Sequence, residues 1–541
     1  MANRGDYDDD KRAAAATYSP NDPALYEGGA KSQVEGKYQG NESDIRQMKV
    51  LGRTQETRRV FSFLSILGFG STLIVTWEVI LSNLGLILLN GGSAGMWWGF
   101  LIVSVGYILV YASISEMASM APTSGGQYHW VSEFAPAGIQ RYLSYMTGWL
   151  CFTGWQSAIT AIGFLVAGII QGLIVLNNES YVPERWHATL LIIAVVAFCV
   201  VVNIFVARRL PLVEGVLAIC HFAGIFIVII VLWTLAPRNN AHDAFLKFSN
   251  NGGWSSDGLS FMVGLLPLTL CLLGFDSQVH MSEETTDAAR SMPRSIMWST
   301  YLNIGMGFLM VITLIFTMGD QDEILASPTG WPFIQVFYNT TKSVAGTDIM
   351  CLLLIFPLTG SVIACVATAS RQIWAFARDG GVPFSATVRH VYAKSAIPIN
   401  AIVISLIVCV LLSLINIGST AALNAILALD LAALLASYTI SISCILYRRF
   451  SKTEPLPPAA WSLGKFGAVI NILAICWLLP IFIFTLFPPV TPVTAAGMNY
   501  GCLLFGFMVL FSTGYYIVHG KKHYISPRER LRRDLQGDYS M

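Results

Sequence analysis

The sequence predicts an all-helical integral membrane protein with twelve transmembrane helices. Only 12% of its 541 residues are charged, whereas 54% are hydrophobic, and the mean hydropathy is +0.60. Soluble domains carry about 25% charged residues, so the chain has about half the usual share. Apolar runs of roughly twenty residues recur along it, and each is about long enough to cross a ~30 Å hydrocarbon core as a helix. The formal net charge of +1 gives no reason to expect a nucleic-acid partner.

Polar or Gly/Pro-rich breaks divide the apolar sequence into separate spans. We predict these at 61–89, 97–118, 142–176, 188–207, 211–236, 258–284, 296–318, 345–376, 398–416, 421–447, 466–487 and 497–518. Lys and Arg are enriched in the cytosolic flanks of membrane helices. With the amino terminus inside, the 33 Lys and Arg residues all fall on the cytosolic side except Arg185, Arg238, Lys247 and Lys342. An odd number of spans would scramble this segregation, so both termini are predicted to be cytosolic.

The spans divide the chain into four segments. Residues 1–53 are polar and lack the apolar core of a signal peptide, so we expect a disordered cytosolic tail. Residues 54–449 hold the first ten spans, residues 450–519 hold the last two, and residues 520–541 form a second cytosolic tail. The glycosylation sequons at Asn178 and Asn339 fall in predicted outer loops, whereas the sequon at Asn41 falls inside.

Two short stretches inside the spans share one pattern. "ILGFGST" covers Ile66–Thr72 in the first span, and "LLGFDSQ" covers Leu272–Gln278 in the sixth. Glycine relaxes backbone limits, and a membrane helix unwinds only where protein or a watery cavity covers the freed peptide groups. Transporters built from inverted repeats place such discontinuous helices at matching positions. Because the stretches lie five spans apart, they enter from opposite sides, and we predict that they meet at one substrate site. The alternative is that these glycines serve only close helix packing.

Three longer motifs resemble those of a known family. They are "ISEMASMAPTSGGQYHW" (Ile114–Trp130), "GFDSQVHMSEETTDAARSMPRSI" (Gly274–Ile296) and "WAFARDGGVPF" (Trp374–Phe384). The first resembles the loop signature of the amino acid–polyamine–organocation permeases. The other two resemble their fungal subgroup of GABA and choline permeases. The resemblance runs from about Glu42 to Arg449 and is far more specific for the family than for the substrate.

The resemblance implies a LeuT-type fold, in which five-plus-five inverted repeats are followed by two extra helices. It also implies proton-coupled transport of small amines or amino acids. We expect the plasma membrane as the location, with the vacuolar membrane second. Lysines of the amino-terminal tail would be the residues through which the ubiquitin machinery removes the protein from the cell surface; they are Lys11, Lys31, Lys37 and Lys49. The alternative is that the tail is only a solvated linker. Matched to the motif, the substrate-binding residues are Gly68, Phe69, Gly70, Ser71 and Thr72 in the first break and Gly274, Phe275, Asp276 and Ser277 in the second.

Ionisable residues at membrane depth cost about 2.5–3.5 kcal/mol each on insertion scales, so they indicate function. Asp276 lies in the second break, where it would bind a substrate ammonium, carry the coupling proton, or simply cap the half-helix. His280 and Glu284 follow at helical spacing and extend a stripe suited to a proton relay. The alternative for Glu283 and Glu284 is structural pairing with Arg290 or Arg294 near the inner end of the helix.

Three further ionisable residues lie within predicted spans. Glu78 lies beside Trp77 in the first span, where it would attract cations in an outer vestibule or bond to a neighbouring helix. His221 lies in the fifth span, where in several relatives a basic residue occupies the region that binds an ion in sodium-coupled cousins. It is predicted to couple transport to pH, with a satisfied core histidine as the alternative. Asp430 in the tenth span is predicted to select a second positive charge on the substrate.

Aromatic side chains in the third span bear on the choice of substrate. Trp149 and Trp155 offer aromatic faces, which attract quaternary ammonium ions, and Gln156 lies in the same span. This composition favours a choline-like substrate, although Trp is also an ordinary interface anchor. Free N–H groups at the first break would instead bind a carboxylate, which GABA has and choline lacks. An amino acid such as GABA and a choline-like amine therefore both stay open.

Other classes of protein fit the sequence poorly. The eight histidines are scattered, and no G-x-S-x-G, H-E-x-x-H or P-loop motif is present, so we predict neither an enzyme nor a metal site nor a cofactor. "HMSEE" lacks the second histidine of a zinc motif. No repeated pore loop indicates a channel. A nutrient transceptor with a signalling role is the alternative from another class.

Overall fold

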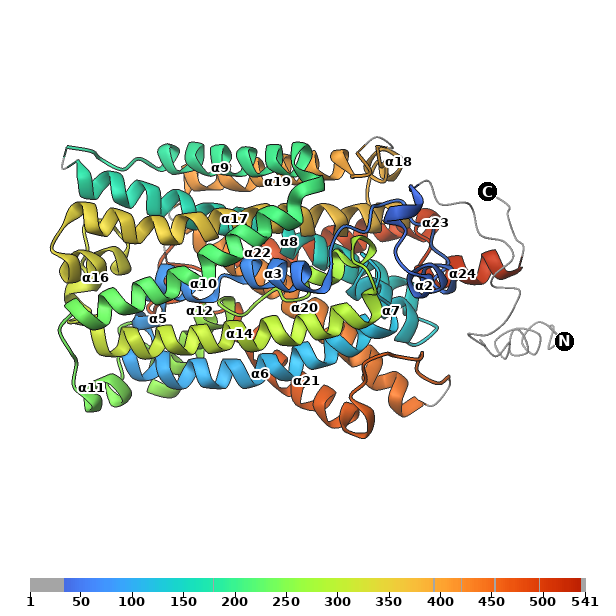
Figure 1. Ribbon diagram of the computed structural model, residues 1–541. Helices are drawn as coiled ribbons and strands as arrows, with labels where there is room; N and C mark the ends of the chain where they lie inside the picture. Colours follow the sequence, from blue (N-terminus) through green and yellow to red (C-terminus); the bar gives the residue numbers. More distant parts are fainter. Residues whose placement is uncertain are drawn as a thin grey trace.

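The computed structural model describes residues 34–178, 180–392, 395–419, 421–451, 454–495 and 497–536. These residues form a helical bundle in which most long helices run along a common axis (Figure 1). The described residues contain isolated β-bridges but no strand. The ten long helices are α6 (Gly92–Met120), α8 (Gln140–Asn177), α9 (Arg185–Phe205), α10 (Leu210–Leu235), α14 (Ala288–Thr317), α17 (Val344–Arg378), α19 (Ile399–Gly418), α20 (Ala422–Ser451), α21 (Gly467–Thr485) and α22 (Gly501–Tyr515).

Two of the twelve predicted spans are interrupted rather than continuous. The first comprises α3 (Phe63–Ile74), α4 (Thr76–Ser82) and α5 (Leu84–Leu89), and the sixth comprises α12 (Asp257–Leu270) and α13 (Ser277–His280). In the described part of the chain, 11 helical stretches are long and apolar enough to cross a membrane, counting Phe63–Ser82 as one. α12 appears only as a shorter apolar helix, because the sixth span unwinds before it is complete. The prediction of an all-helical membrane protein is confirmed.

Shorter helices lie between the long ones or near the two ends of the described chain. They are α2 (Glu42–Val50), α7 (Gln127–Phe134), α11 (Ala241–Leu246), α15 (Gln321–Leu325), α16 (Pro332–Thr341), α18 (Ser385–Val388), α23 (Lys521–His523) and α24 (Pro527–Gln536). Single turns of 3₁₀ or π helix are η2 (Gly36–Tyr38), η3 (Ala207–Arg209), η4 (Ser282–Glu284), η5 (Gly464–Phe466) and η6 (Tyr516–Gly520).

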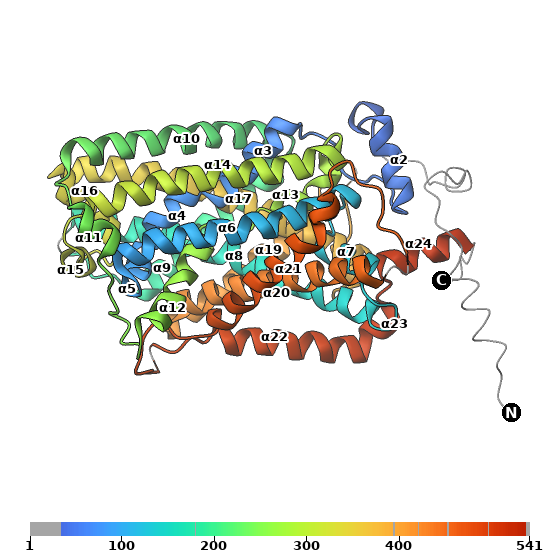
Figure 2. The ribbon, with the colours of Figure 1, turned by 90° about the horizontal axis from the view of Figure 1, so that it is seen from below.

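Burial separates central helices from peripheral ones. In the apolar windows of Phe63–Ser82 and Ala422–Ser451, 78% of the residues are buried, against 17% in Gly501–Arg533. The interrupted first span and α20 therefore lie at the centre, whereas α22 lies at the rim. Figure 2 shows α22 and α10 on opposite edges of the bundle. Large apolar side chains such as Phe205, which is 81% exposed, cover the outer surface as expected for contact with lipid.

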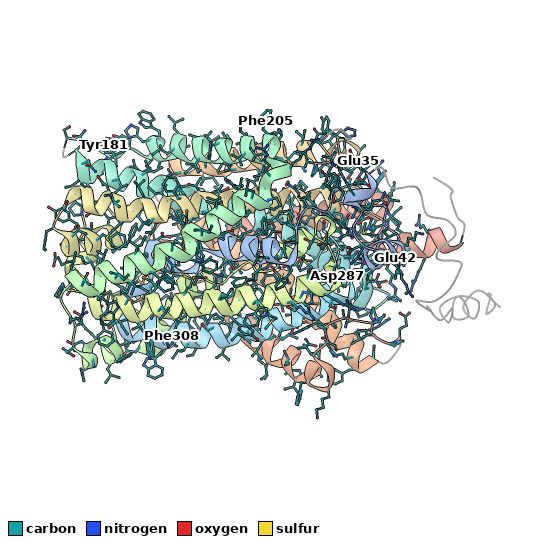
Figure 3. All side chains as sticks on the ribbon, viewed as in Figure 1. Glu35, Glu42, Tyr181, Phe205, Asp287 and Phe308 are labelled. Atoms are coloured by element: carbon teal, nitrogen blue, oxygen red, sulfur yellow. The ribbon has the colours of Figure 1, made fainter. Side chains whose placement is uncertain are left out.

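The two ends of the bundle differ. α2, α7 and α24 gather at one end, which we call the α2–α24 end, and α16 lies at the other (Figures 1 and 2). Figure 3 places Glu35, Glu42 and Asp287 toward the α2–α24 end and Tyr181 at the opposite one. The sequon Asn178 is exposed close to Tyr181. The sequon Asn339 instead lies within α16, where its Nδ2 donates to Oε1 of Glu323 over 2.8 Å.

The predicted disordered tail differs from the structure over its last part. Residues 1–33 lie outside the described residues, as do Lys11 and Lys31. Residues 34–53 of this segment are folded, and α2 begins with a capping box in which Asn41 and Asp44 exchange side-chain and backbone hydrogen bonds. Asp44 also accepts hydrogen bonds from the backbone N–H groups of Asp287 and Ala288 at 2.9 and 3.1 Å. These tertiary contacts fix the segment although its composition is polar.

Candidate functional site

The break in the sixth span lies where the sequence placed it. Residues 271–276 are not helical, and Gly274 adopts φ 105°, which favours glycine. The hydroxyl of Tyr111 donates to the carbonyl of Leu272 over 2.7 Å and accepts from the N–H of Gly274 over 2.9 Å. One buried side chain on α6 therefore satisfies two of the peptide groups that unwinding frees.

The break in the first span lies elsewhere than predicted. Gly68, Phe69, Gly70, Ser71 and Thr72 all lie inside continuous α3, and the helix is interrupted at Val75, which adopts φ 43° and ψ 50°. The hydroxyl of Ser361 donates to the carbonyl of Leu73. A β-branched residue keeps a left-handed conformation only where its surroundings impose it. The hydrogen bond from Ser361, rather than a glycine, therefore compensates the interruption at Val75.

The two breaks meet in the interior, as predicted. The hydroxyl of Thr76, the first residue after the first break, donates to the carbonyl of Cys271 over 2.9 Å. A side chain at Gly274 would lie 3.4 Å from Ile74 and 3.2 Å from Trp155. Segments nearly two hundred residues apart in sequence thus join at one point, with bent or unwound backbone on both sides.

A small cavity of about 50 Å³ opens beside this junction. Residues from both interrupted spans line it, together with residues from α8, α17 and α20. The predicted site residues Trp155 and Gly274 are among them, and so is Asp430. The remaining lining side chains are almost all apolar. The cavity therefore combines a stretch of unwound backbone at Gly274, one indole ring and one carboxylate.

The other predicted binding residues lie around the cavity rather than in its wall. Phe275 packs edge-on against Tyr111 with ring centroids 5.0 Å apart, and Phe69 packs likewise on Phe61 at 5.8 Å. The buried hydroxyls of Ser71 and Ser277 have no hydrogen-bond partner among the described residues. Both hydroxyls therefore stay available to a ligand or to water after a rearrangement.

Trp149 and Gln156 are engaged elsewhere. Trp149 packs in a separate aromatic cluster that includes Phe376. Gln156 donates to the hydroxyl of Ser405 over 3.0 Å. Of the third-span residues singled out in the sequence, Trp155 alone lines the cavity.

Gly70 serves close packing, which was the alternative for these glycines. A Cβ atom at Gly70 would lie 2.0 Å from Nε2 of Gln278 on α13. Gln278 cannot swing aside cheaply, because it is fully buried, accepts from Ser295 and donates to Ser299 over 2.8 Å. At Gly68 the nearest atom to an added Cβ is Ala218 at 3.8 Å, an ordinary contact.

We therefore expect Gly70→Ala to be damaging and Gly68→Ala to be tolerated. Overpacking a well-filled interior costs about 1–3 kcal/mol, so Gly70→Ala should clearly lower the melting temperature of the purified protein. Gly68→Ala is the matched control, since it adds the same methyl group two residues away on the same helix. Equal melting temperatures for the two variants would contradict this reading of the packing.

Asp276 is the most connected residue of the second break. One carboxylate oxygen accepts from the hydroxyl of Tyr438 on α20, and the other accepts from Nε2 of Gln127 on α7 over 2.5 Å. Nε2 of His280 lies 3.6 Å from the same carboxylate, while Nδ1 of His280 lies 2.8 Å from the carbonyl of Ser124. The group is fully buried. It therefore ties the unwound segment to two other elements and to a titratable ring.

Glu78 and His221 form a second buried pair. Nδ1 of His221 lies 2.7 Å from Oε1 of Glu78, and neither side chain is exposed. Trp77 donates to the backbone carbonyl of His221 over 3.2 Å and stacks on its ring. For Glu78 this is bonding to a neighbouring helix, the alternative to an open vestibule. The pair joins α4, directly after the first break, to α10.

Sequence reasoning missed several residues of this region. Glu214 on α10 is fully buried and lies 2.6 Å from the hydroxyl of Thr72. The sequence did indicate Glu214, because it is an acidic residue inside the predicted span 211–236. Tyr111, Gln127 and Tyr438 had no such signal, because neutral polar side chains are ordinary in membrane helices and loops.

The three family-like motifs come together at the α2–α24 end. Glu283 from the second motif pairs with Arg378 from the third at 2.8 Å, and it accepts from the N–H of Ser124 in the first at 3.2 Å. Glu284 pairs with Arg371 at 2.8 Å. The expectation of structural pairing for both glutamates holds, but with these partners instead of Arg290 or Arg294. Both glutamates therefore pair with arginines of α17 and not with the arginines that are nearest in the sequence.

Asp379 is the hub of this network. Arg53 donates to both of its oxygens at 2.8 and 2.7 Å, the hydroxyl of Tyr128 donates over 2.9 Å, and Arg530 of α24 lies 3.6 Å away. Burial alone would raise the pKa of Asp379, but Arg53 and the other guanidinium groups outweigh it and hold this pKa below the ordinary 3.8. Four segments are thereby locked at one end of the bundle.

No group of three or more His, Cys, Asp or Glu side chains suited to a metal occurs in the part of the chain that the structure describes. The site is instead a pair of broken helices, a small cavity and buried acid–base pairs.

Comparison with known proteins agrees with this architecture. Residues 61–508 match the family model described as amino acid permease. The chain is 30% identical to a choline transporter of Saccharomyces cerevisiae over 487 residues, covering 89% of this chain and 85% of the relative. It is 29% identical to an uncharacterized amino-acid permease of Schizosaccharomyces pombe over 500 residues, covering 92% of each. It is 26% identical to amino-acid permease 2 of Neurospora crassa over 492 residues, covering 90% of this chain and 89% of the relative.

These matches confirm the resemblance seen in the motifs. The family consists of transporters, so the prediction that the chain is not an enzyme is also confirmed. A match through nearly all of the predicted spans, on a chain with interrupted helices meeting at a cavity, leads to one conclusion: the chain belongs to the amino acid permease family.

Proposed function

We propose that the protein is a secondary active transporter that moves small amines or amino acids by alternating access around the cavity between the two breaks. The observation that carries this proposal is the junction of Thr76 with Cys271, where both interrupted spans meet beside the cavity. Freed peptide groups at such a point can exchange protein partners for a solute. The relatives named for choline and for amino acids support both substrate types.

The proposal includes a LeuT-type inverted repeat. The interrupted first and sixth spans are five spans apart, which gives them opposite directions through the membrane. The ion-pair network around Asp379 then closes one end of the pathway. We place this end in the cytosol, together with both termini, because the basic residues segregate to it. The plasma membrane is the proposed location, with the vacuolar membrane second, and tail lysines as targets of the ubiquitin machinery.

The test of this function is uptake into proteoliposomes. The purified protein is reconstituted and offered radiolabelled choline, GABA, other amino acids and polyamines, with and without an imposed pH gradient. Accumulation of at least one of these solutes above protein-free liposomes is expected, and a gradient acid outside should increase it. A chain that accumulates none of them would overturn the proposal.

Proton coupling is assigned to the pair of His221 and Glu78. Nδ1 of His221 lies 2.7 Å from Oε1 of Glu78, so a proton can pass between the imidazole and the carboxylate. His221→Ala is therefore expected to flatten the dependence of the initial uptake rate on pH between about 5 and about 8.

His129→Ala is the matched control for this prediction. Burial, helped by Arg53, lowers the pKa of His129 to about 3, so this histidine stays neutral throughout that range. The shape of the pH profile should therefore survive His129→Ala. An unchanged profile in His221→Ala would remove His221 from coupling.

A further inference from the structure

Asp430 stands apart from the other buried acids of the protein. It is 6% exposed, lies on the central helix α20 and lines the cavity beside Trp155 and Gly274. Its Oδ1 has no hydrogen-bond partner among the described residues. Within that same part of the chain, no basic side chain lies within ion-pair distance of Asp430.

Each of the other buried acids among the described residues accepts at least one hydrogen bond, although Glu214 accepts its bond from the hydroxyl of Thr72 and has no basic partner. Glu78 has His221, Asp379 has Arg53, and Asp276 accepts from Gln127 and Tyr438. The pairs of Glu116 with Arg449 and of Glu284 with Arg371 follow the same pattern. A buried carboxylate without compensation is unfavourable unless a cation or donor reaches it. For Asp430 the described residues supply none, and the carboxylate lines the cavity where a solute is proposed to bind.

The remaining wall of the cavity suits an alkylated cation. Among its described lining residues, Asp430 is the only side chain with a carboxylate, ammonium, guanidinium or imidazole group. The indole of Trp155 adds an aromatic face, which attracts ammonium groups. Leu73, Leu273 and Leu434 supply apolar surface for methyl or methylene groups. A zwitterion would bring a second charge, its carboxylate, into a wall that offers no cation to meet it.

We infer that Asp430 binds the positive charge of the substrate and makes the cavity selective for amines with net positive charge over zwitterions. This inference rests on the proposed function and narrows it to a substrate class. Quaternary or protonated alkylammonium ions fit, whereas GABA-like solutes should bind poorly. The substrate then supplies the partner that Oδ1 of Asp430 lacks among the described residues.

The test compares choline and GABA as probes in the same proteoliposomes. The unmodified protein is expected to take up choline at least about tenfold faster than GABA at equal low concentration. Asp430→Asn, which keeps the shape and removes the charge, should reduce choline uptake about tenfold or more and reduce GABA uptake much less, because the net charge of GABA is zero. Asp430→Glu, which restores the charge, should recover part of the choline uptake.

Several outcomes would overturn the inference. An equal fall of choline and GABA uptake in Asp430→Asn would make Asp430 a structural acid. Unchanged choline uptake in that variant, or uptake of GABA but not choline by the unmodified protein, would also overturn it while leaving the transport proposal intact. If Asp430→Asn does not fold, the melting temperature of the unmodified protein decides: choline must raise it more than GABA does. If the proposed function itself is wrong, the result is different: the unmodified protein takes up none of the solutes.

Discussion

Asp276→Asn is expected to abolish uptake while the variant still folds and reaches the membrane. The carboxylate accepts from Tyr438 and Gln127 at once, and an amide turns one of these acceptors into a donor. Hydrogen bonds to a charged group contribute about 1.5–3 kcal/mol each, so losing one corresponds to roughly a 10- to 100-fold effect. Because these bonds join the unwound segment to α7 and α20, the loss falls on the part of the protein that has to rearrange.

Ser282→Ala is the control for this variant. Ser282 is buried six residues further along, and within the described chain its hydroxyl has no hydrogen-bond partner. Initial uptake rates and surface amounts are measured for both variants. We expect normal uptake for Ser282→Ala and uptake near background for Asp276→Asn at equal surface amounts. Normal transport by Asp276→Asn would reduce Asp276 to a helix cap without a part in transport.

Arg53→Ala is expected to destabilise the α2–α24 end strongly. The pair of Arg53 and Asp379 is buried, and removal of one partner leaves an uncompensated charge, at a cost of about 3–5 kcal/mol. Tyr128 and Arg530 keep part of their contacts with Asp379, so the lower part of that range is expected. The melting temperature of Arg53→Ala should fall well below that of the unmodified protein, and Asp379→Asn should have less effect in the Arg53→Ala background.

The exposed pair of Lys37 and Glu35 provides the control. Both side chains are largely exposed, so Lys37→Ala should leave the melting temperature unchanged. The pH dependence gives an independent check. Since the folded-state pKa of Asp379 lies below 3.8, its stabilisation is present above that pH and is lost only as the pH falls further, through the folded value. The difference between the protein and Asp379→Asn should therefore stay constant from about pH 5 to about pH 8. A difference that shrinks within this window would contradict the assignment.

The positions of the spans follow from hydropathy, because a helix in lipid must be apolar over its whole length. The predicted span 142–176 became α8 (Gln140–Asn177), and the span 345–376 became α17 (Val344–Arg378). The break at Gly274 was equally predictable, since its φ of 105° suits glycine far better than other residues.

The first break shows where local reasoning ends. Gly68 and Gly70 looked like the interruption, yet the helix runs through them and stops at Val75. A glycine permits a break or a close approach, and the partner decides between the two. Here Gln278 lies against Gly70. On either side of Val75, the hydroxyl of Ser361 donates to the carbonyl of Leu73 and the hydroxyl of Thr76 donates to the carbonyl of Cys271.

Composition and motif alone identify a membrane permease and the interruption at Gly274, because apolar length and a glycine motif are properties of neighbouring residues. Which side chains compensate each buried charge is a different kind of fact. Glu283 pairs with Arg378 of α17 instead of Arg290, which is nearer in the sequence. Asp276 accepts hydrogen bonds from Gln127 and Tyr438, which belong to two further helices. Only the packed bundle decides such pairings, since they depend on distances between segments far apart in the chain. Within the described residues, the same packing leaves Oδ1 of Asp430 without a hydrogen-bond partner.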